Sequence, residues 1–514
     1  MNEETMYDKQ RYSLLQNGMI RFLIVGVFII GSMIPVAGYA QSPCATDHNI
    51  AGKRILDSAS GAVVLEMDTT CQTSDEAPVT VDVQQPQLNN VPRSGTTTLM
   101  SRDPENKQFS MGTLNPSISA TGQYVLFNTF IPGTPEGQVY VRDQSTDTTK
   151  LISVSADGEP GNGLSDLARI TPNGRYVVFS SFADNLVADD TNGANDIFLY
   201  DGRQESIQRV NVASDGTESN GFSTFFPSVS ADGRYIVFNS DADNLVPDDT
   251  NESNDVFIRD RVFRTTQRVS TAQDGSAAGG VSVSISSSGR FIAYVSSSDD
   301  VVADDTNGAA DAFVYDRITK RTELVSVASD GTQAELPSGV SPRTLVFDVE
   351  MSPDGRYVVF SSKADNLVEN DTNDQTDVFL HDRTRNTTER VSITADGDEG
   401  NAASAYAAVS LGGRYIVFHS NASNLVANDA NAQTDVFVRD RVEGTTTRMS
   451  VDSGGAESNG ASGLITQRDD TFSFITAEPG IDWLGRTTVF ESSATNLVTD
   501  DTNEHADIFG STMQ

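Results

Sequence analysis

The chain has 514 residues, and its 72 Asp and Glu residues against 35 Lys and Arg residues give a formal net charge of −37 at pH 7. A chain this acidic is repelled by the phosphates of nucleic acids and by anionic membranes, which excludes both as partners. The charge favours high solubility and, where partners are charged, cationic ones such as metal ions, basic proteins or basic peptides.

The N-terminus carries the features of an export signal. An apolar run from Phe22 to Ala37 follows Arg21, and Gly38 and Ala40 place small residues before a cleavage point. This pattern predicts a signal peptide over residues 1–40. The run is about 16 residues long, whereas a membrane-spanning helix needs roughly 20, so an uncleaved anchor is the alternative. We expect an exported, periplasmic or secreted protein that has no membrane contact after cleavage.

Residues 41–95 form a small separate module in this interpretation. It contains the two cysteines of the chain, Cys44 and Cys71. In an oxidising compartment such a pair predicts a disulfide, and two unpaired thiols are the alternative. The polar, proline-containing stretch from Gln72 to Gly95 is typical of a linker.

From about residue 96 to the C-terminus, one segment recurs. Around Arg175 it reads N-G-R-Y-V-V-F-S-S-F-A-D-N-L-V-A-D-D-T-N-G-A-N-D-I-F-L-Y-D. The copies, close and weak, centre on Arg234, Arg290, Arg356, Arg414, Gln123 and Arg486. A unit that repeats in this way cannot bury its own faces and stacks on its neighbours.

Each repeat predicts four short antiparallel strands. Runs such as Arg175–Phe179 and Asp196–Tyr200 are β-branched and aromatic on both alternating faces, so both faces are expected to be covered. Runs such as Gln267–Thr271 and Phe226–Ser230 supply two more strands, and turn dipeptides such as Asp232-Gly233 join them. Four covered strands per unit describe a blade of an all-β propeller.

The segments S-x-D-G-R-Y-[IV]-V-F, D-[VI]-F-[VIL]-x-D-R and T-x-R-V-S resemble the WD40-like β-propeller repeat of TolB-type proteins. The resemblance covers residues 96–514, and it implies a single propeller with a binding role. It does not imply the partner. We count seven repeats here, longer than the usual unit, where TolB-type propellers have six. Seven blades are therefore expected, and six blades with a degenerate remnant are the alternative.

The two ends of the repeat region predict how the ring closes. The last repeat ends at Asp507–Gly510 without a T-x-R-V-S strand, whereas Thr96–Ser101 matches Thr445–Ser450. We expect the N-terminal segment to complete the last blade, because an open sheet edge invites aggregation.

Six of the repeats carry an acidic loop, A-D-N-L-V-x-D-D-T-N-x-x-x-D or a near copy, between their second and third strands; the first repeat, with Ile131–Thr134, lacks it. In a meander these loops emerge on one face. The spacing D-x-N-x-x-x-D offers oxygen ligands for calcium. The alternative is that Asp and Asn side chains cap the loop backbone through Asx-turns. The predicted calcium ligands are Asp190, Asn192, Asp196, Asp249, Asn251, Asp255, Asp305, Asn307, Asp311, Asp371, Asn373, Asp377, Asp429, Asn431, Asp435, Asp501, Asn503 and Asp507.

No catalytic constellation is found in the sequence. There is no G-x-S-x-G motif, and the four histidines, His48, His381, His419 and His505, are scattered. The Arg before each Tyr-[Ile/Val]-Val-Phe strand is expected to pair with the Asp of the Asp-Arg turn.

The sequence therefore predicts an exported, monomeric, non-enzymatic propeller that binds a protein, a peptide or a surface ligand through one face, with no cofactor other than calcium. The alternative is a hydrolase or lyase with its site in the central channel. That alternative needs non-repeating polar residues at the axis, for example from Ser223–Phe225 or Tyr406–Ala408.

Overall fold

The computed structural model describes residues 95–130, 137–223, 226–335, 337, 340–342, 345–463, 465 and 478–513, and the backbone of three strands nearer the N-terminus. The chain divides into two compact units, Met1–Gln87 and Leu88–Gln514. In the first unit, β1 (Ile24–Val25), β2 (Ala51–Leu56) and β3 (Val63–Asp68) form an antiparallel sheet in the order β1-β3-β2. Apart from the backbone of β1, the predicted signal peptide lies outside the described residues, as do Cys44 and Cys71 of the predicted disulfide.

The second unit contains seven four-stranded antiparallel sheets, which we number as blades 1 to 7. Blades 1 to 3 consist of β5 (Thr113–Ile118), β6 (Tyr124–Phe130), β7 (Gly137–Asp143) and β8 (Thr148–Leu151); β9 (Ser165–Ile170), β10 (Tyr176–Ser181), β11 (Asp196–Asp201) and β12 (Ser206–Arg209); and β13 (Ser228–Val229), β14 (Tyr235–Ser240), β15 (Asp255–Asp260) and β16 (Thr265–Arg268).

Blades 4 to 6 repeat the same order along the chain. They consist of β17 (Val281–Ile285), β18 (Phe291–Ser296), β19 (Asp311–Asp316) and β20 (Arg321–Leu324); β21 (Val346–Met351), β22 (Tyr357–Ser362), β23 (Asp377–Asp382) and β24 (Thr387–Arg390); and β25 (Ser404–Val409), β26 (Tyr415–Ser420), β27 (Asp435–Asp440) and β28 (Thr445–Arg448). A 3-10 turn, η3 (Leu411–Gly413), precedes β26.

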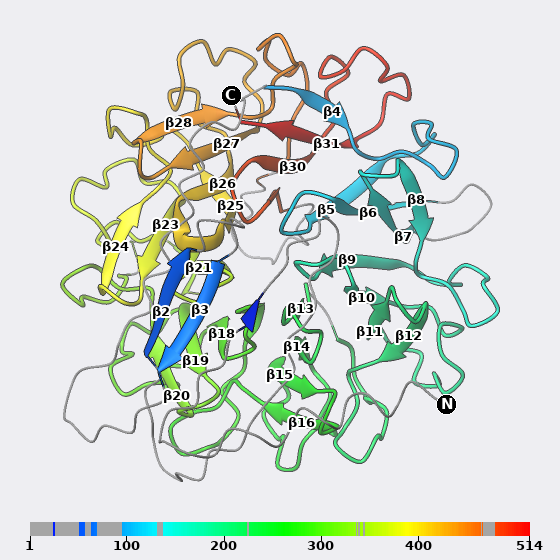
Figure 1. Ribbon diagram of the computed structural model, residues 1–514. Helices are drawn as coiled ribbons and strands as arrows, with labels where there is room; N and C mark the ends of the chain where they lie inside the picture. Colours follow the sequence, from blue (N-terminus) through cyan, green and yellow to red (C-terminus); the bar gives the residue numbers. More distant parts are fainter. Residues whose placement is uncertain are drawn as a thin grey trace. The chain divides into compact units, whose positions relative to one another are not determined.

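Blade 7 combines strands from both ends of the repeat region. It consists of β29 (Gly480–Ile481), β30 (Thr487–Ser492), β31 (Asp507–Thr512) and β4 (Thr97–Leu99). Strand β4 pairs antiparallel with β31, Leu99 opposite Phe509 and Thr97 opposite Ser511, and Figure 1 shows it in blue beside the red β31. The N-terminal segment thus occupies the place that the fourth strand takes in the other blades.

The blades are arranged in a ring, with the first strand of each blade towards the centre and the fourth at the rim (Figure 1). This confirms the predicted all-β propeller with seven blades. In the described part of the chain, no helix is long and apolar enough to cross a membrane.

The core lies between adjacent blades because each sheet is apolar on both faces. Val178 and Leu199 of blade 2, for example, belong to one buried cluster with Ile236 and Phe257 of blade 3. Burying such side chains contributes roughly 1.5–3 kcal/mol each.

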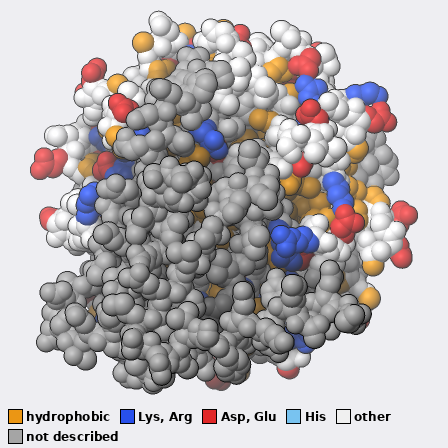
Figure 2. Space-filling view, in the orientation of Figure 1, with side chains coloured by type: hydrophobic (Ala, Val, Ile, Leu, Met, Phe, Trp, Pro, Cys, Tyr) orange, Lys and Arg blue, Asp and Glu red, His pale blue; other side chains and the backbone are white. Residues whose placement is uncertain are grey.

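A repeated ion pair joins the second and third strands in five of the blades, at the end opposite the acidic loops. The Arg before the second strand binds the Asp at the end of the third strand, as predicted, with nitrogen–oxygen distances of 2.7–2.8 Å in five blades. Arg486 of blade 7 instead lies 3.5 Å from Asp482. Figure 2 shows basic side chains beside acidic ones around the rim.

Strand β4 is expected to hold the ring closed. Leu99 is 4% exposed and packs against the core between blades 6 and 7, so Leu99→Ala should lower the free energy of unfolding by about 2–5 kcal/mol. Thr98→Ala, at the exposed position of the same strand, should change it little. Deleting residues 96–101 should remove cooperative unfolding. Chemical denaturation measures all three, and an unchanged transition in the deletion variant would contradict this closure.

Candidate functional site: the acidic loops and the central channel

The acidic loops contact the segments that lead from one blade to the next. In blade 2, the backbone N–H and the hydroxyl of Thr191 donate to Glu218 at 2.8 and 2.7 Å. Thr372 donates to Glu399 in the same way in blade 5. The loops and the connecting segments therefore lie at the same end of each blade, opposite the turns between the third and fourth strands.

The asparagine of each acidic loop caps the loop backbone. Its side-chain oxygen accepts a hydrogen bond from the backbone N–H two residues later, at 2.7–3.1 Å, in all six loops. The alternative of Asx-turns is thus seen in every loop. The capping residues are Asn192, Asn251, Asn307, Asn373, Asn431 and Asn503.

The last Asp of each acidic loop opens the third strand and is 0% exposed in all six blades. Each accepts a hydrogen bond from the fourth-strand side: Ser270 donates to Asp255 at 2.6 Å, and Asn211 donates to Asp196 at 2.5 Å. Burial raises the pKa of Asp311 to about 7 and that of Asp507 to about 6. The six residues are Asp196, Asp255, Asp311, Asp377, Asp435 and Asp507.

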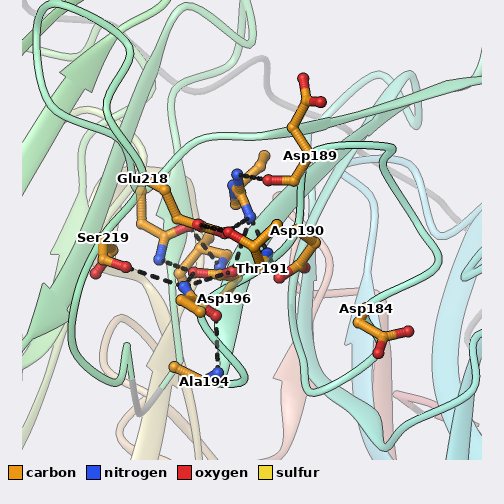
Figure 3. Close-up of polar contacts among 12 residues, drawn as sticks. Asp184, Asp189, Asp190, Thr191, Ala194, Asp196, Glu218 and Ser219 are labelled. Carbon is orange, nitrogen blue, oxygen red and sulfur yellow. Dashed lines mark hydrogen bonds and ion pairs between the residues drawn. The ribbon is translucent and has the colours of Figure 1, made fainter.

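In blade 2, the carboxylate oxygens of Asp190, Asp196 and Glu218 lie within 4.8 Å of one another (Figure 3). The Nη1 atom of Arg209 lies among them, 3.3 Å from each Asp and 2.5 Å from Glu218. A guanidinium therefore occupies the place where a cation would bind.

The same arrangement recurs with the remaining predicted ligands of blades 3, 5 and 6. Arg268 lies 3.2 Å from Asp249, Arg390 3.1 Å from Asp371 and Arg448 3.2 Å from Asp429.

In blades 4 and 7, a glutamine rather than an arginine donates hydrogen bonds to the two Asp carboxylates of the acidic loop. Leu324 and Leu99 stand where the others have Arg, and Gln333 and Gln108 stand where blades 2, 5 and 6 have Glu. The Gln108 Nε2 atom donates to Asp501 and Asp507, both at 2.7 Å.

Gln333 does the same in blade 4, donating to Asp305 at 2.5 Å and to Asp311 at 3.4 Å. Two Asp with Arg and Glu carry a net −2, as do two Asp with Leu and Gln, so the exchange preserves the local charge. An N–H donor lies between the two carboxylates in both versions.

The inner strands show a different kind of pattern. Seven residues, one per blade, occupy the same register position on the first strand, each paired with the third residue of the Tyr-Val-Val-Phe segment or its equivalent. They are Ser117, Arg169, Ser228, Ser284, Glu350, Ala408 and Gly480. Five of these are small, so Arg169 and Glu350 depart from the repeat.

Arg169 contacts a residue from a blade that is not its neighbour in the ring. It forms an ion pair with Glu478, which precedes β29 in blade 7. Blade 1 lies between blades 2 and 7 in the ring, so the pair spans the inner edge of blade 1, beside the central channel. The pKa of Glu350 is raised to about 7, chiefly by burial; the charge of Arg169 opposes this rise and the charge of Glu478 adds to it. The charge of Glu350, on blade 5, is therefore also coupled to this pair.

Asp348 and Tyr406 complete what we call the channel cluster: Arg169, Asp348, Glu350, Tyr406 and Glu478. Asp348 accepts the backbone N–H groups of Ser361 at 2.9 Å and Tyr406 at 3.1 Å, and burial raises its pKa to about 7.

Tyr406 is 6% exposed, and among the described residues its hydroxyl has no hydrogen-bond partner. Burial, and then the charges of Asp348 and Glu478, raise the pKa of that hydroxyl.

Of the channel cluster, the sequence had singled out only Tyr406. The other four were missed, although Glu350 stands where five of the blades have Ser, Ala or Gly. His381 and His419 lie elsewhere, inside the blades: His381 bonds to Thr388 at 2.9 Å, and burial lowers the pKa of His419 to about 3.

No family model matches the chain, and the search of curated proteins finds no match either. Among solved structures, the chain is similar to TolB from Acinetobacter baumannii, with a TM-score of 0.34, 16% identity, and coverage of 58% of this chain and 63% of that one. It is also similar to oligogalacturonate lyase from Vibrio parahaemolyticus, with a TM-score of 0.45, 11% identity, and coverage of 90% and 97%.

A third similar structure is the β-propeller domain of the Trilobed protease from Pyrococcus furiosus, with a TM-score of 0.46, 10% identity, and coverage of 78% and 93%. The chain spans less than two thirds of the TolB structure. At these identities the likeness concerns the fold. The protein is a β-propeller, similar to TolB-type propellers and to the propellers of enzymes.

The two versions of the acidic loop predict a thermodynamic coupling. Arg209→Leu alone leaves Asp190, Asp196 and Glu218 without their cation and should cost about 3–5 kcal/mol of stability. Adding Glu218→Gln reproduces the residues of blades 4 and 7 and should restore roughly 2 kcal/mol or more. Denaturation of the wild type, both single variants and the double variant measures this coupling. Additive effects would show that the Gln cannot replace the Arg.

Proposed function

We propose that the protein is an exported, non-enzymatic binding propeller that holds a cationic group of a protein or peptide ligand in its central channel. The observation that carries the proposal is the channel cluster. Among the described residues, it combines three acids, Asp348, Glu350 and Glu478, with one cation, Arg169, which pairs with Glu478. An ammonium or guanidinium group of the ligand would supply the missing positive charge.

The energetics of the channel cluster support a ligand rather than a structural role. Burying a carboxylate without a matching cation costs free energy, which appears here as the raised pKa of Asp348 and Glu350. Ser, Ala or Gly suffices at the position of Glu350 in most other blades. The ring therefore closes without these acids, and groups with shifted pKa values cluster at functional sites.

A hydrolase or lyase in the same channel is the second candidate. It is favoured by the pKa of about 7 of Asp348 and Glu350, which suits proton transfer near neutral pH. The hydroxyl of Tyr406 stands beside them as a further proton donor.

Selection of a displayed random-peptide library on the wild type tests the proposal. Peptides rich in Lys or Arg should be enriched, and Glu350→Gln and Glu478→Gln should each weaken them. Recovery of these peptides intact after incubation supports binding alone, whereas cleavage that Glu350→Gln abolishes would favour the enzyme. No dependence on either acid would contradict a channel site.

The raised pKa of Glu350 predicts how stability depends on pH. The folded state, with a pKa of about 7, holds this proton more tightly than the unfolded state, where the pKa is about 4.3. Its contribution to stability therefore falls as pH rises from about 4 to 7. Glu350→Gln should raise stability at pH 8 by about 1–2 kcal/mol, discounted for partial exposure, and change it little at pH 4. Thermal melts measure this, with the exposed Glu335→Gln as control.

Calcium binding in the acidic loops stays a prediction, and blades 4 and 7 suit it best. There an ion displaces a neutral amide rather than a guanidinium, and one oxygen each of Asp305 and Asp501 is buried without a hydrogen-bond partner. At 100 times its Kd, calcium should stabilise the fold by about 2.7 kcal/mol per site. Thermal melts in calcium, in magnesium and in chelator test this. Equal effects of both ions would contradict a specific calcium site and would mean that hydrogen bonds within the loops suffice to stabilise them.

A further inference from the structure

A cavity of about 190 Å³ lies between blades 3 and 4, among residues of their hairpin turns. Its lining includes Arg234, Phe263, Gln267, Arg317 and Lys320. Because these turns join the third and fourth strands, the cavity opens at the end of the blades opposite the acidic loops. We call it the hairpin pocket.

One cation of the hairpin pocket is already matched. Arg234 binds Asp260 through three hydrogen bonds, two from Nε at 3.0 and 3.2 Å and one from Nη2 at 2.8 Å. Its guanidinium also lies 4.9 Å from the centre of the Phe263 ring. Arg234 and Asp260 therefore form a neutral wall.

Arg317 differs from its equivalents because no described side chain of the preceding blade accepts a hydrogen bond from it. In blade 3, Arg261 donates to the side-chain oxygen of Gln208, at 3.4 Å. In blades 5 and 6 the corresponding residues, Arg383 and Arg441, form ion pairs with Glu323 and Glu389 of the preceding blade. In blade 4 the preceding blade offers Gln267 instead, and no hydrogen bond joins it to Arg317.

The guanidinium of Arg317 lies 4.0 Å above the ring of Tyr235, and its Nε donates to the carbonyl of Gly289 at 2.9 Å. Among the described residues, its two terminal nitrogens have no partner. The stacking and the Nε bond hold these nitrogens in place at the cavity.

Lys320 adds a second cation to the same cavity, and within the described part of the chain it has no carboxylate partner. Two cations without a carboxylate partner among the described residues are unusual in a chain that has 72 acidic and only 35 basic residues. A guanidinium with two free terminal nitrogens binds a carboxylate through paired hydrogen bonds. Pockets for whole small molecules usually measure about 300–1,000 Å³, so this smaller one fits a single side chain.

The rim of the hairpin pocket is apolar. Val262, Phe263 and Ile318 are 66%, 71% and 63% exposed. Exposed apolar and aromatic side chains around an arginine are typical of the centres of protein interfaces. The net negative charge of the chain does not prevent an acidic group from binding there, because charges beyond about 8 Å are largely screened at physiological salt.

We propose that the hairpin pocket binds an Asp or Glu side chain, flanked by apolar residues, of a protein partner. The carboxylate bonds to Arg317 and Lys320, and the flanking residues cover Val262, Phe263 and Ile318. This surface is separate from the channel cluster, so either site can fail without the other.

A displayed library of random eight-residue peptides, selected on the intact protein, tests the proposal. A class of peptides with one Asp or Glu between apolar residues should be enriched on the wild type. The most enriched such peptide should lose at least tenfold in affinity, by fluorescence anisotropy, when its acid is replaced by the amide. Absence of such a class, or equal affinity of the amide peptide, would overturn the proposal.

Variants that copy the protein's own repeats locate the site. Gln267→Glu supplies the glutamate that blades 4 and 5 offer to Arg383 and Arg441, so it should pair with Arg317 and weaken the peptide at least tenfold while the fold stays intact. Arg317→Ala and Lys320→Ala should each weaken it as well. Arg383→Ala, which removes an arginine already paired, and Glu350→Gln, in the channel, should leave affinity unchanged.

Two further results would overturn the proposal. The first is full affinity in the Gln267→Glu variant, with folding verified by its melt. The second is displacement of the peptide by glucuronate at concentrations at which N-acetylglutamate does not displace it, which would assign the pocket to an acidic sugar.

Discussion

A fully buried carboxylate at the start of the third strand is the constraint on which six of the blades depend. A buried charge without partners destabilises a fold by several kcal/mol. Asp196, for example, accepts hydrogen bonds from Asn192 of the loop, from Arg209 of the fourth strand and from Asn211 of the segment that follows it. Blade 1 shows the neutral alternative. There Gln138 takes the place of the Asp, accepts the same hydrogen bond from Ser153 at 2.7 Å, and no acidic loop precedes it. The acidic loop and the buried Asp therefore occur together.

The features that could be predicted from the sequence are those that repeat within one blade. The strands, the Arg175–Asp201 type of ion pair and the Asx-turns each join residues at a fixed, short spacing, and so the repeat displays them several times. The ion pair between Arg209 and Asp190 could not be predicted from the sequence, because it depends on the register in which two strands pair. The ion pair between Arg169 and Glu478 is harder still to predict from the sequence. It depends on the number of blades and on how their inner strands face the axis.

Repetition also gives a background against which function stands out. Where a position is Ser, Ala or Gly in most blades, the scaffold requires only a small side chain, so a charged residue there needs another cause. This reasoning identifies Glu350 in the channel. The reverse identifies Arg317: its equivalents in blades 5 and 6 have glutamate partners, whereas among the described residues Arg317 has no side-chain acceptor. Both inferences compare the chain with itself.

The closure of the ring joins the hydrophobic and the electrostatic parts of the fold. Strand β4 contributes only three residues, too few for strand pairing alone to hold a seven-bladed ring. The same segment brings Leu99 into the core, and Ser101 and Gln108 to the buried carboxylate of Asp507, at 2.9 and 2.7 Å. Opening blade 7 would therefore expose apolar surface and also strip a buried charge of its donors. Blade 7 is therefore complete only when the N-terminal segment is in place, because without that segment the buried carboxylate of Asp507 would lack these hydrogen-bond donors.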